Sequence, residues 1–292
     1  MQSPEWGRWD IIEIHFDATV MRTPHLGVGL GYRVAHHDDI VRHRDEIDFL
    51  EVISDQFLYA TDEKLEAMLA AASGLPLVSH SLALSVGTAT SLDENYVARN
   101  ADFVQRINAS WFSDHLSFTK VPEIDLGTLI PLWFTEEVVE TVVKNIMTVK
   151  SALPDTLFLV ENITYYFSMA KNEMSEAEFI TRILELTGCG LLLDLENVYI
   201  NSYNLKFDPY AFLDDLPLER VVQIHIAGHG APADMILDTH DHPVSQEVWE
   251  LLEYVVKRSP VRSILLERDD ESPSFGGIME ELAHARRILA MR

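Results

Sequence analysis

The feature that most constrains this chain is a regular alternation between short apolar runs and longer amphipathic segments. The short runs are rich in Val, Ile, Leu and Phe, which is typical of buried parallel strands, and the longer segments have the periodicity of helices that cover a sheet. The predicted strands occupy residues 26–32, 48–54, 75–80, 111–118, 156–162, 190–197, 220–226 and 262–268. The predicted helices occupy residues 61–72, 94–108, 135–152, 175–187, 209–214, 245–258 and 277–291.

This order of elements predicts one α/β fold, a (β/α)8 TIM barrel of the xylose-isomerase-like kind. Strict alternation implies a parallel sheet, and about eight units imply that the sheet closes into a barrel. The alternative is an open, doubly wound sheet, which is disfavoured because no glycine-rich phosphate loop opens the first helix. We therefore expect a single catalytic barrel domain over residues 25–292 and an N-terminal flanking arm over residues 1–24.

Side chains that can bind a metal stand at the end of nearly every predicted strand. The carboxyl ends of the strands of an α/β barrel converge on one mouth, so these side chains are expected to face one another. Buried carboxylates without partners are costly, and divalent cations would neutralise them. The strand-end and loop candidates are Glu51, Asp55, His80, Asp114, His115, Glu161, Asn162, Asp194, Glu196, Asn197, His225, His229, Asp238, His240, Asp241, His242 and Glu267.

The types of ligand limit the choice of metal. The chain has one cysteine, Cys189, which excludes an intrachain disulfide and a thiolate cluster. Mixed histidine and carboxylate donors suit Fe, Mn or Zn. The donors exceed what one ion can use, so we expect two or three ions, with Glu161 as the candidate for a bridging carboxylate.

Charge and hydropathy exclude two classes of partner. The formal net charge is −25, so the protein would repel a phosphate backbone, and no nucleic acid partner is expected. No apolar run approaches the ~18 residues that a membrane span needs, and residues 1–20 lack the basic head and apolar run of a signal peptide. We expect a cytoplasmic protein with no membrane partner.

Six sequence blocks resemble one known family, the multinuclear non-haem iron-dependent oxidative enzymes, which includes enzymes of methanobactin and 3-thiaglutamate biosynthesis. The blocks are FLEVIS (49–54), SDHL (113–116), VEN (160–162), LLDLENVY (192–199), IHIAGH (224–229) and DTHDHPV (238–244). The resemblance runs from about Leu26 to Ile288. It implies metal ligands at His80, Asp114, His115, Glu161, Asn197, His225, Asp238, His240 and Glu267.

The resemblance also implies an activity. A member of this family would hold two or three iron ions, cycling between Fe(II) and Fe(III), and use O2 as co-substrate to modify cysteine residues of a ribosomally synthesised precursor peptide. A small partner protein that binds the leader segment, as a heterodimer, is expected as well. Asp114, Glu161 and Asp194 are the candidate catalytic residues on this resemblance, while ligand roles for Asp194, Glu196 and His229 stay open.

The chain departs from the family pattern at two places. The strand-six motif often has two Asn, where this chain has Glu196-Asn197, and strand eight often ends in Glu-Trp-Asp, where this chain has Glu267-Arg268-Asp269. The alternative function is a divalent-metal hydrolase or isomerase of the endonuclease IV or xylose isomerase type, in which the metals act as Lewis acids and activate water. A non-catalytic protein that binds a partner or stores metal is a third hypothesis.

Overall fold

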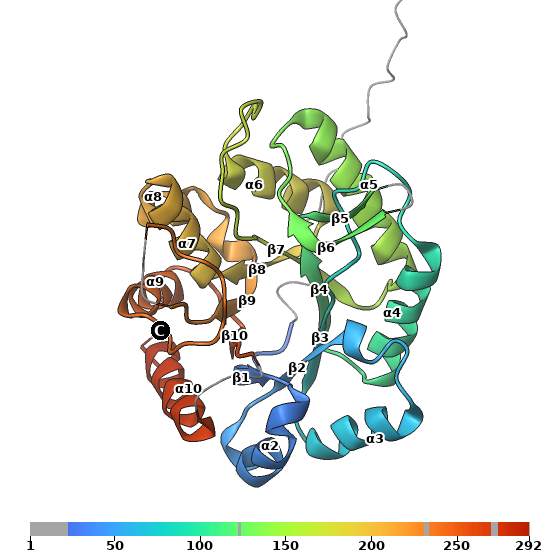
Figure 1. Cartoon of the computed structure of the whole chain (residues 1–292), viewed down its shortest axis with the longest axis vertical. Coiled ribbons are helices and arrows are strands. Elements are labelled where there is room, and N and C mark those ends of the chain that lie inside the picture. Colours follow the sequence, from blue (N-terminus) through green and yellow to red (C-terminus); the bar gives the residue numbers. More distant parts are fainter. Residues whose placement is uncertain (1–22, 122–123, 231–233, 270–273, 292) are drawn as a thin grey trace, which may run out of the picture.

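The computed structural model describes residues 23–121, 124–230, 234–269 and 274–291, and its centre is a closed barrel of parallel strands (Figure 1). The order around the barrel is β1-β10-β9-β8-β7-β4-β3-β2, so neighbours in sequence are neighbours in space. The barrel strands are β1 (Gly27–Gly31), β2 (Leu50–Ile53), β3 (Leu77–His80), β4 (Trp111–His115), β7 (Leu157–Glu161), β8 (Gly190–Asp194), β9 (Val221–Ile226) and β10 (Ser263–Leu266). The predicted (β/α)8 barrel is confirmed.

Helices surround the barrel in Figure 1 and cover its outer face. They are α2 (His37–His43), α3 (Asp62–Ala71), α4 (Glu94–Arg106), α5 (Glu136–Ala152), α6 (Glu176–Thr187), α7 (Leu195–Leu205), α8 (Pro209–Asp215), α9 (Gln246–Val256) and α10 (Phe275–Leu289). Side-chain caps fix where several begin: the Thr135 hydroxyl accepts the N–H of Val138, and the Ser175 hydroxyl accepts that of Glu178. Gly188, with φ 68°, ends α6 in the left-handed conformation.

Several elements differ from the sequence prediction. The strand predicted to run through Asn197 ends at Asp194, because the Asp194 carboxylate accepts the N–H of Asn197 and starts α7 there. The strand predicted for 111–118 ends at His115, and an antiparallel hairpin of β5 (Phe118–Val121) and β6 (Ile124–Ile130) follows it. Helix α7 was not predicted, and α2 occupies residues that the sequence left open between a helix and a loop.

An apolar layer fills the barrel below its mouth. This layer is a buried cluster that is separate from the main hydrophobic core, and it consists of Phe49, Val78, Trp111, Leu157, Leu159, Leu192, Val222 and Leu265. Side chains two positions apart on a strand share a face. Phe49, Val78, Leu159, Leu192 and Leu265 therefore lie on the same face as the strand-end residue two positions later. The polar side chains at the strand ends therefore lie directly above this buried apolar layer.

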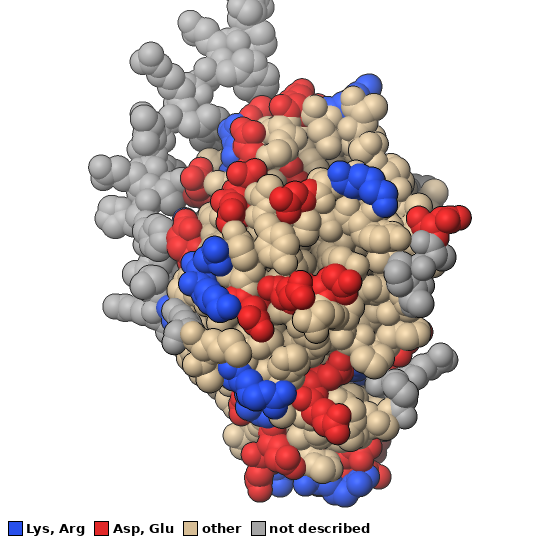
Figure 2. All heavy atoms as spheres, turned by 90° about the vertical axis from the view of Figure 1, so that its left-hand side faces the viewer, with Lys and Arg blue, Asp and Glu red and all other residues tan. Residues whose placement is uncertain are grey.

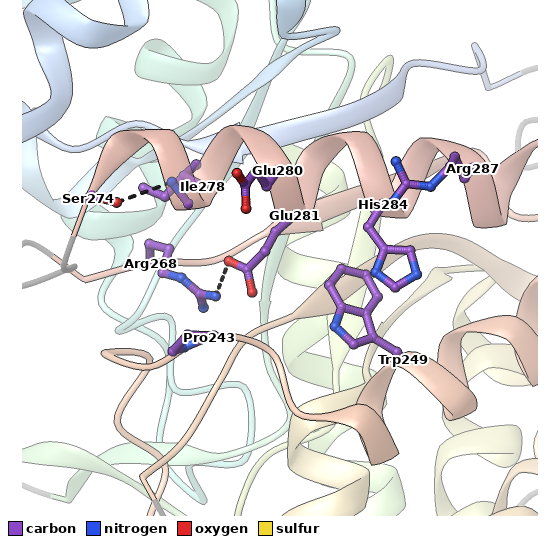
Figure 3. Close-up of a pocket in the computed structure, with 10 residues that line it drawn as sticks. Pro243, Trp249, Arg268, Ser274, Ile278, Glu280, Glu281, His284 and Arg287 are labelled. Carbon is purple, nitrogen blue, oxygen red and sulfur yellow. Dashed lines mark hydrogen bonds and ion pairs between the residues drawn. The ribbon is translucent and has the colours of Figure 1, made fainter.

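A cleft of about 360 Å³ lies on the outer side of the barrel, beside α10 (Figure 3). The Trp249 indole of α9 stacks on the His284 imidazole of α10 with their centroids 4.3 Å apart, and Arg268 lies at the other end of the cleft. The cleft lining includes none of the nine predicted metal ligands. It is therefore separate from the strand-end side chains.

The surface carries the acidic excess of the sequence. On the face in Figure 2, Asp and Glu side chains are spread widely, and Lys and Arg stand between them in smaller groups. None of the helices in the described parts of the chain has the length and hydropathy needed to cross a bilayer. Residues 1–22, which make up most of the predicted flanking arm, lie outside the described residues.

Candidate metal centre

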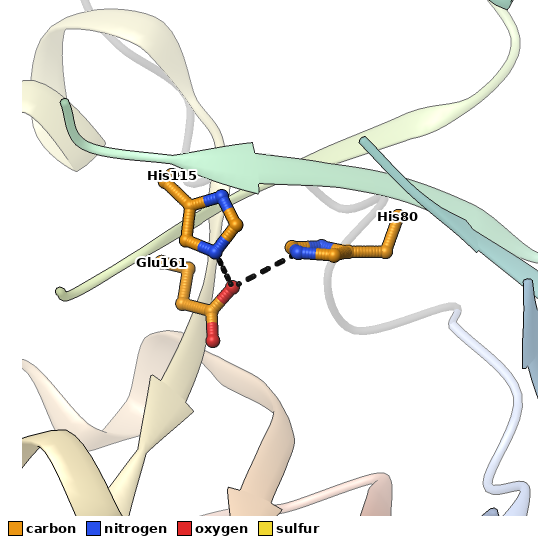
Figure 4. A group of neighbouring side chains, drawn as sticks. All are labelled: His80, His115 and Glu161. Atoms are coloured by element: carbon orange, nitrogen blue, oxygen red, sulfur yellow. Dashed lines mark ion pairs between the residues drawn. The ribbon is translucent and has the colours of Figure 1, made fainter. Parts of the chain in front are cut away.

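The first ligand group is formed by the ends of three neighbouring strands, β3, β4 and β7. His80, His115 and Glu161 each offer a ligand atom within 4.8 Å of the others, and all three are buried. The Nε2 atoms of His80 and His115 lie 3.4 and 3.3 Å from the same oxygen, Oε2 of Glu161 (Figure 4). The Ser113 hydroxyl, 2.8 Å from Nδ1 of His80, holds that ring with Nε2 toward the carboxylate.

The second ligand group shares Glu161 with the first. Glu161, Asp194 and His225 again offer ligand atoms within 4.8 Å of one another, from the ends of β7, β8 and β9. Oε1 of Glu161 lies 3.1 Å from Nδ1 of His225. One carboxylate thus faces a different set of imidazoles with each of its oxygens, which is the arrangement that a bridging ligand requires.

A third set of side chains lies next to His225 and comes from the end of β10 and the loop after β9. Oε2 of Glu267 lies 3.4 Å from Nδ1 of His225, and Oε1 lies 3.7 Å from Nδ1 of His240. His240 Nε2 is 2.6 Å from Oδ1 of Asp238. The backbone of His240 has φ 50°, a conformation that non-glycine residues seldom adopt and that is concentrated at functional sites. Asp238, His240 and Glu267 are therefore brought together, although the loop that carries two of them is irregular.

The buried charges of the two linked groups depend on one another. Burial by itself would raise the pKa of Glu161, but the imidazoles of His225, His115 and His80 lower it to about 2. Burial, and then the charge of Glu161, hold the pKa of Asp194 well above its usual range. For His225, the carboxylates of Glu51 and Glu161 outweigh burial and raise the pKa. Protons and imidazolium charges at these positions occupy places that a metal ion would take.

Several buried atoms in this region make no hydrogen bond within the described parts of the chain. They include Oε2 of Glu161 and Nδ1 of His225, which face the centre of the two groups. Buried polar atoms are rarely left without partners, and an ion is one of the explanations when they are. The donors are imidazole nitrogens and carboxylate oxygens, which suit Fe, Mn or Zn. The residues therefore fit a multinuclear centre of this kind.

Two of the predicted ligands are directed elsewhere. The carboxylate of Asp114 accepts the N–H of Leu84 at 3.0 Å, the N–H of His115 at 2.6 Å and the Ser81 hydroxyl. Burial raises the pKa of Asp114 to about 7. Asn197 lies in the first turn of α7 rather than in a strand, and its side-chain oxygen accepts the Thr164 hydroxyl. The structure does not bring Asp114 into either group.

Two residues outside the nine ligands implied by the resemblance lie against the ligand groups. Glu51 on β2 is 1% exposed, and its Oε2 is 3.0 Å from Nε2 of His225. Glu51 was a strand-end candidate and lies in the FLEVIS block, but the resemblance implied no ligand role for it. Arg33, just after β1, donates to Oε1 of Glu267 at 3.2 Å. Nothing in the sequence around Arg33 marks this contact, because the two residues are 234 positions apart.

Residues 27–290 match the model of a family described as "RiPP precursor modification enzyme MbnB/TglH/ChrH". The chain belongs to this family. The match confirms the resemblance to the multinuclear non-haem iron-dependent oxidative enzymes and covers almost the same residues. A UPF0276 protein of Caulobacter vibrioides is 36% identical over 264 residues, which are 90% of this chain and 94% of the relative. A UPF0276 protein of Anaeromyxobacter sp. is 36% identical over 265 residues, 91% of this chain and 93% of the relative.

Several solved structures share the fold of this chain, although their sequence identity to it is low. A xylose isomerase domain containing protein from Salmonella typhimurium has a TM-score of 0.61 and 15% identity, and the match covers 92% of this chain and 98% of that one. The 3-keto-D-glucoside 4-epimerase of E. coli has a TM-score of 0.59 and 13% identity, with 90% and 99% covered. The xylose-isomerase-like character of the barrel is thereby confirmed.

The structure shows what contacts Glu196 and Arg268, the residues at the two departures from the family pattern. Oε1 of Glu196 lies 3.1 Å from Nδ1 of His229, whose ring stacks on Tyr199, and burial raises the pKa of Glu196. Arg268 is 2% exposed and forms an ion pair with Glu281 of α10 at the edge of the outer cleft (Figure 3). In this member of the family, Glu196 therefore forms a buried pair with His229. The side chain of Arg268 is directed to the outer cleft and away from the mouth of the barrel.

Proposed function

We propose that this protein is an O2-dependent iron oxidoreductase that modifies cysteine residues of a ribosomally synthesised precursor peptide. The observation that carries the proposal is the placement of Glu161 between two ligand groups at the mouth of a barrel that belongs to a family of precursor modification enzymes. A carboxylate shared in this way supports a centre of more than one ion. The hydrolase or isomerase alternative is supported by the fold alone, which does not determine chemistry.

We assign the ligands of two or three iron ions to the three sets of side chains. His80, His115 and Glu161 would hold one ion, and Glu161, Asp194 and His225 a second, with Asn197 beside it. The third set would hold a further ion through Asp238, His240 and Glu267. Bound iron supplies the redox chemistry with O2 that amino-acid side chains lack.

The chain contributes the positions of these ligands. Ser113 fixes the ring of His80, and Asp114 holds the backbone at His115 and Leu84, so we assign Asp114 a supporting role at His115. Asp194 both caps α7 and faces Glu161, which connects the start of that helix to the centre. The apolar layer formed by Phe49, Val78, Trp111, Leu157, Leu159, Leu192, Val222 and Leu265 keeps water from reaching the ligands through the barrel.

The proposed substrate is supported by the family description, which names precursor modification. The substrate would be a cysteine-containing precursor peptide, and a small partner protein would hold its leader segment. A peptide can reach the ligand sets from the mouth, since the side chain of Glu267 is 14% exposed and that of His240 is 17% exposed. His225 and Glu161 are enclosed beneath them, at 0% and 2%.

The test is reconstitution of the full chain with Fe(II) under anaerobic conditions, followed by metal analysis. The loaded protein is then mixed with a candidate cysteine-bearing peptide and partner protein, sought among the products of neighbouring genes, O2 is admitted, and the peptide is analysed by mass spectrometry. A mass change located at cysteine, dependent on iron and O2, supports the proposal. Zinc as the native metal, with no O2 consumed, would instead favour hydrolysis or isomerisation.

A further inference from the structure

A chain of four buried side chains runs beneath the second ligand group. Nε1 of Trp111 lies 2.5 Å from Oε1 of Gln223, and Nε2 of Gln223 lies 2.6 Å from Oε2 of Glu51. The same oxygen of Glu51 lies 3.0 Å from Nε2 of His225. All four residues are at most 1% exposed, so water cannot replace any of these contacts.

The identity of each donor in this chain is fixed from the Trp111 end. An indole N–H can only donate, so the Gln223 atom that faces it must be the carbonyl oxygen. The amide nitrogen of Gln223 is then directed at Glu51, and an amide nitrogen also only donates. Oε2 of Glu51 therefore acts as an acceptor.

The same oxygen is the acceptor for the imidazole of His225. Nε2 of His225 and Nε2 of Gln223 are 2.8 Å apart and converge on Oε2 of Glu51. A ring proton on Nε2 donates to the carboxylate, whose negative charge makes it the stronger partner. A lone pair on Nε2 could accept the second N–H of Gln223, but it would also face the carboxylate oxygen at 3.0 Å and be repelled by it. The other ring nitrogen, Nδ1, faces Oε1 of Glu161 at 3.1 Å and Oε2 of Glu267 at 3.4 Å.

We propose that Glu51 is a positioning residue: held by Gln223 and Trp111, it keeps the ring proton of His225 on Nε2 and so presents Nδ1 to a metal ion between Glu161, Asp194 and His225. This inference rests on the proposed metal centre. Metal-bound histidines commonly donate their second N–H to a carboxylate or carbonyl, which fixes the ring and raises its basicity as a ligand. His80 has only the neutral Ser113 hydroxyl at the corresponding position.

The experiment measures metal content and affinity in the full-length protein, with Fe(II) and with diamagnetic Zn(II) as probes. Glu51→Gln replaces the acceptor by an amide that can turn its NH2 toward His225, so we expect the affinity of one metal site to fall roughly 10- to 100-fold. The exchange variant Glu51→Gln/Gln223→Glu moves the carboxylate to the neighbouring position. Because Nε2 of Gln223 already lies 2.8 Å from Nε2 of His225, most of the affinity should return. A residue needed only for packing would not be rescued in this way.

A second measurement determines the tautomer of His225 in the wild-type protein. In Zn(II)-loaded protein with 15N-labelled histidine, the ring signals of His225 are identified by their loss in His225→Gln. A proton on Nε2 supports the proposal, and a proton on Nδ1 overturns it. A wild-type protein that binds no metal refutes the metal centre together with this inference. A wild-type protein that binds metal, with unchanged metal affinity in a folded Glu51→Gln, refutes the role of Glu51 alone.

Discussion

Glu161 and His225 face each other at 3.1 Å, from Oε1 to Nδ1, while the second oxygen of Glu161 faces His80 and His115. The two ligand groups are therefore not independent, since one carboxylate belongs to both. The loss of charge at this residue should affect two metal positions, whereas the loss of an imidazole should affect one.

Replacing Glu161 by Gln should remove the metal from both groups. The amide keeps the shape of the side chain but offers one weak oxygen donor and one NH2, which cannot bridge. We expect metal analysis after anaerobic Fe(II) reconstitution to show that both shared positions are empty and that O2-dependent activity is lost. His80→Gln should leave the group of Glu161, Asp194 and His225 able to bind.

The matched control for this change is Glu176→Gln. Glu176 is a partly buried carboxylate at the start of α6 that accepts the Tyr165 hydroxyl at 2.7 Å, and it is not a member of either ligand group. Its variant should retain the wild-type metal content. If Glu161→Gln kept the same iron content as this control, a shared ligand at position 161 would be refuted.

Metal binding should also raise the stability of the fold. Ligands that bind only the folded state stabilise it by RT ln(1 + [L]/Kd), which is about 2.7 kcal/mol for one site at a metal concentration of 100 times Kd. We expect the thermal unfolding temperature to rise with added Fe(II) or Zn(II) under anaerobic conditions and to fall with a chelator. The increase should be absent in Glu161→Gln, and an equal increase in that variant would mean that the metal binds elsewhere.

The barrel could be predicted because each strand is recognisable by itself as a short apolar run in the sequence. Runs such as Leu157–Glu161 and Gly190–Asp194 are apolar except at the end, and both become buried strands that end in site carboxylates. The rule that strand ends share one mouth then placed His80, Glu161 and His225 together without further information. Parallel pairing explains why residues so distant in sequence could be assigned to one site.

Two features of the site depend on contacts between side chains that the sequence pattern does not specify. Asp114 alternates with Ser113 and His115, so its side chain leaves the inner face and meets Ser81 and Leu84. Glu51 becomes specific only through its contact with His225, 174 positions away. Strand periodicity gave the face of each residue, but no local pattern encodes these long-range partners.

Asp114 should make the metal-free protein less stable as the pH rises. Its folded pKa of about 7 lies above the ordinary value of 3.8, so between these values the folded state binds a proton that the unfolded state releases. Stability from this group is full below about pH 4 and declines toward pH 7, by up to about 1.4 kcal/mol per pH unit. Asp114→Asn, measured by urea unfolding with chelator at several pH values, should have the shallower dependence.

The comparison concerns the slope of stability against pH, since an asparagine also loses one of the hydrogen bonds that the carboxylate accepts. The variant can therefore be less stable at every pH and still satisfy the prediction. Equal slopes for the two proteins between pH 4 and 7 would show that Asp114 is ionised throughout this range, with its three hydrogen bonds outweighing the effect of burial.

Gly228→Ala should disturb the third set of ligands from a distance. A Cβ at Gly228 would lie 2.2 Å from the carbonyl oxygens of both His242 and Pro243, which are backbone atoms and cannot rotate away. The loop that carries Asp238 and His240 would have to move, at a cost of about 1–3 kcal/mol. We expect lower thermal stability and weaker binding of the ion assigned to Asp238, His240 and Glu267, with the group of His80, His115 and Glu161 unaffected.

Gly276→Ala is the control, because a Cβ there meets nothing within 4 Å. A Gly228→Ala protein with the stability and iron content of this control would show that the loop yields freely and does not set the geometry of the third set.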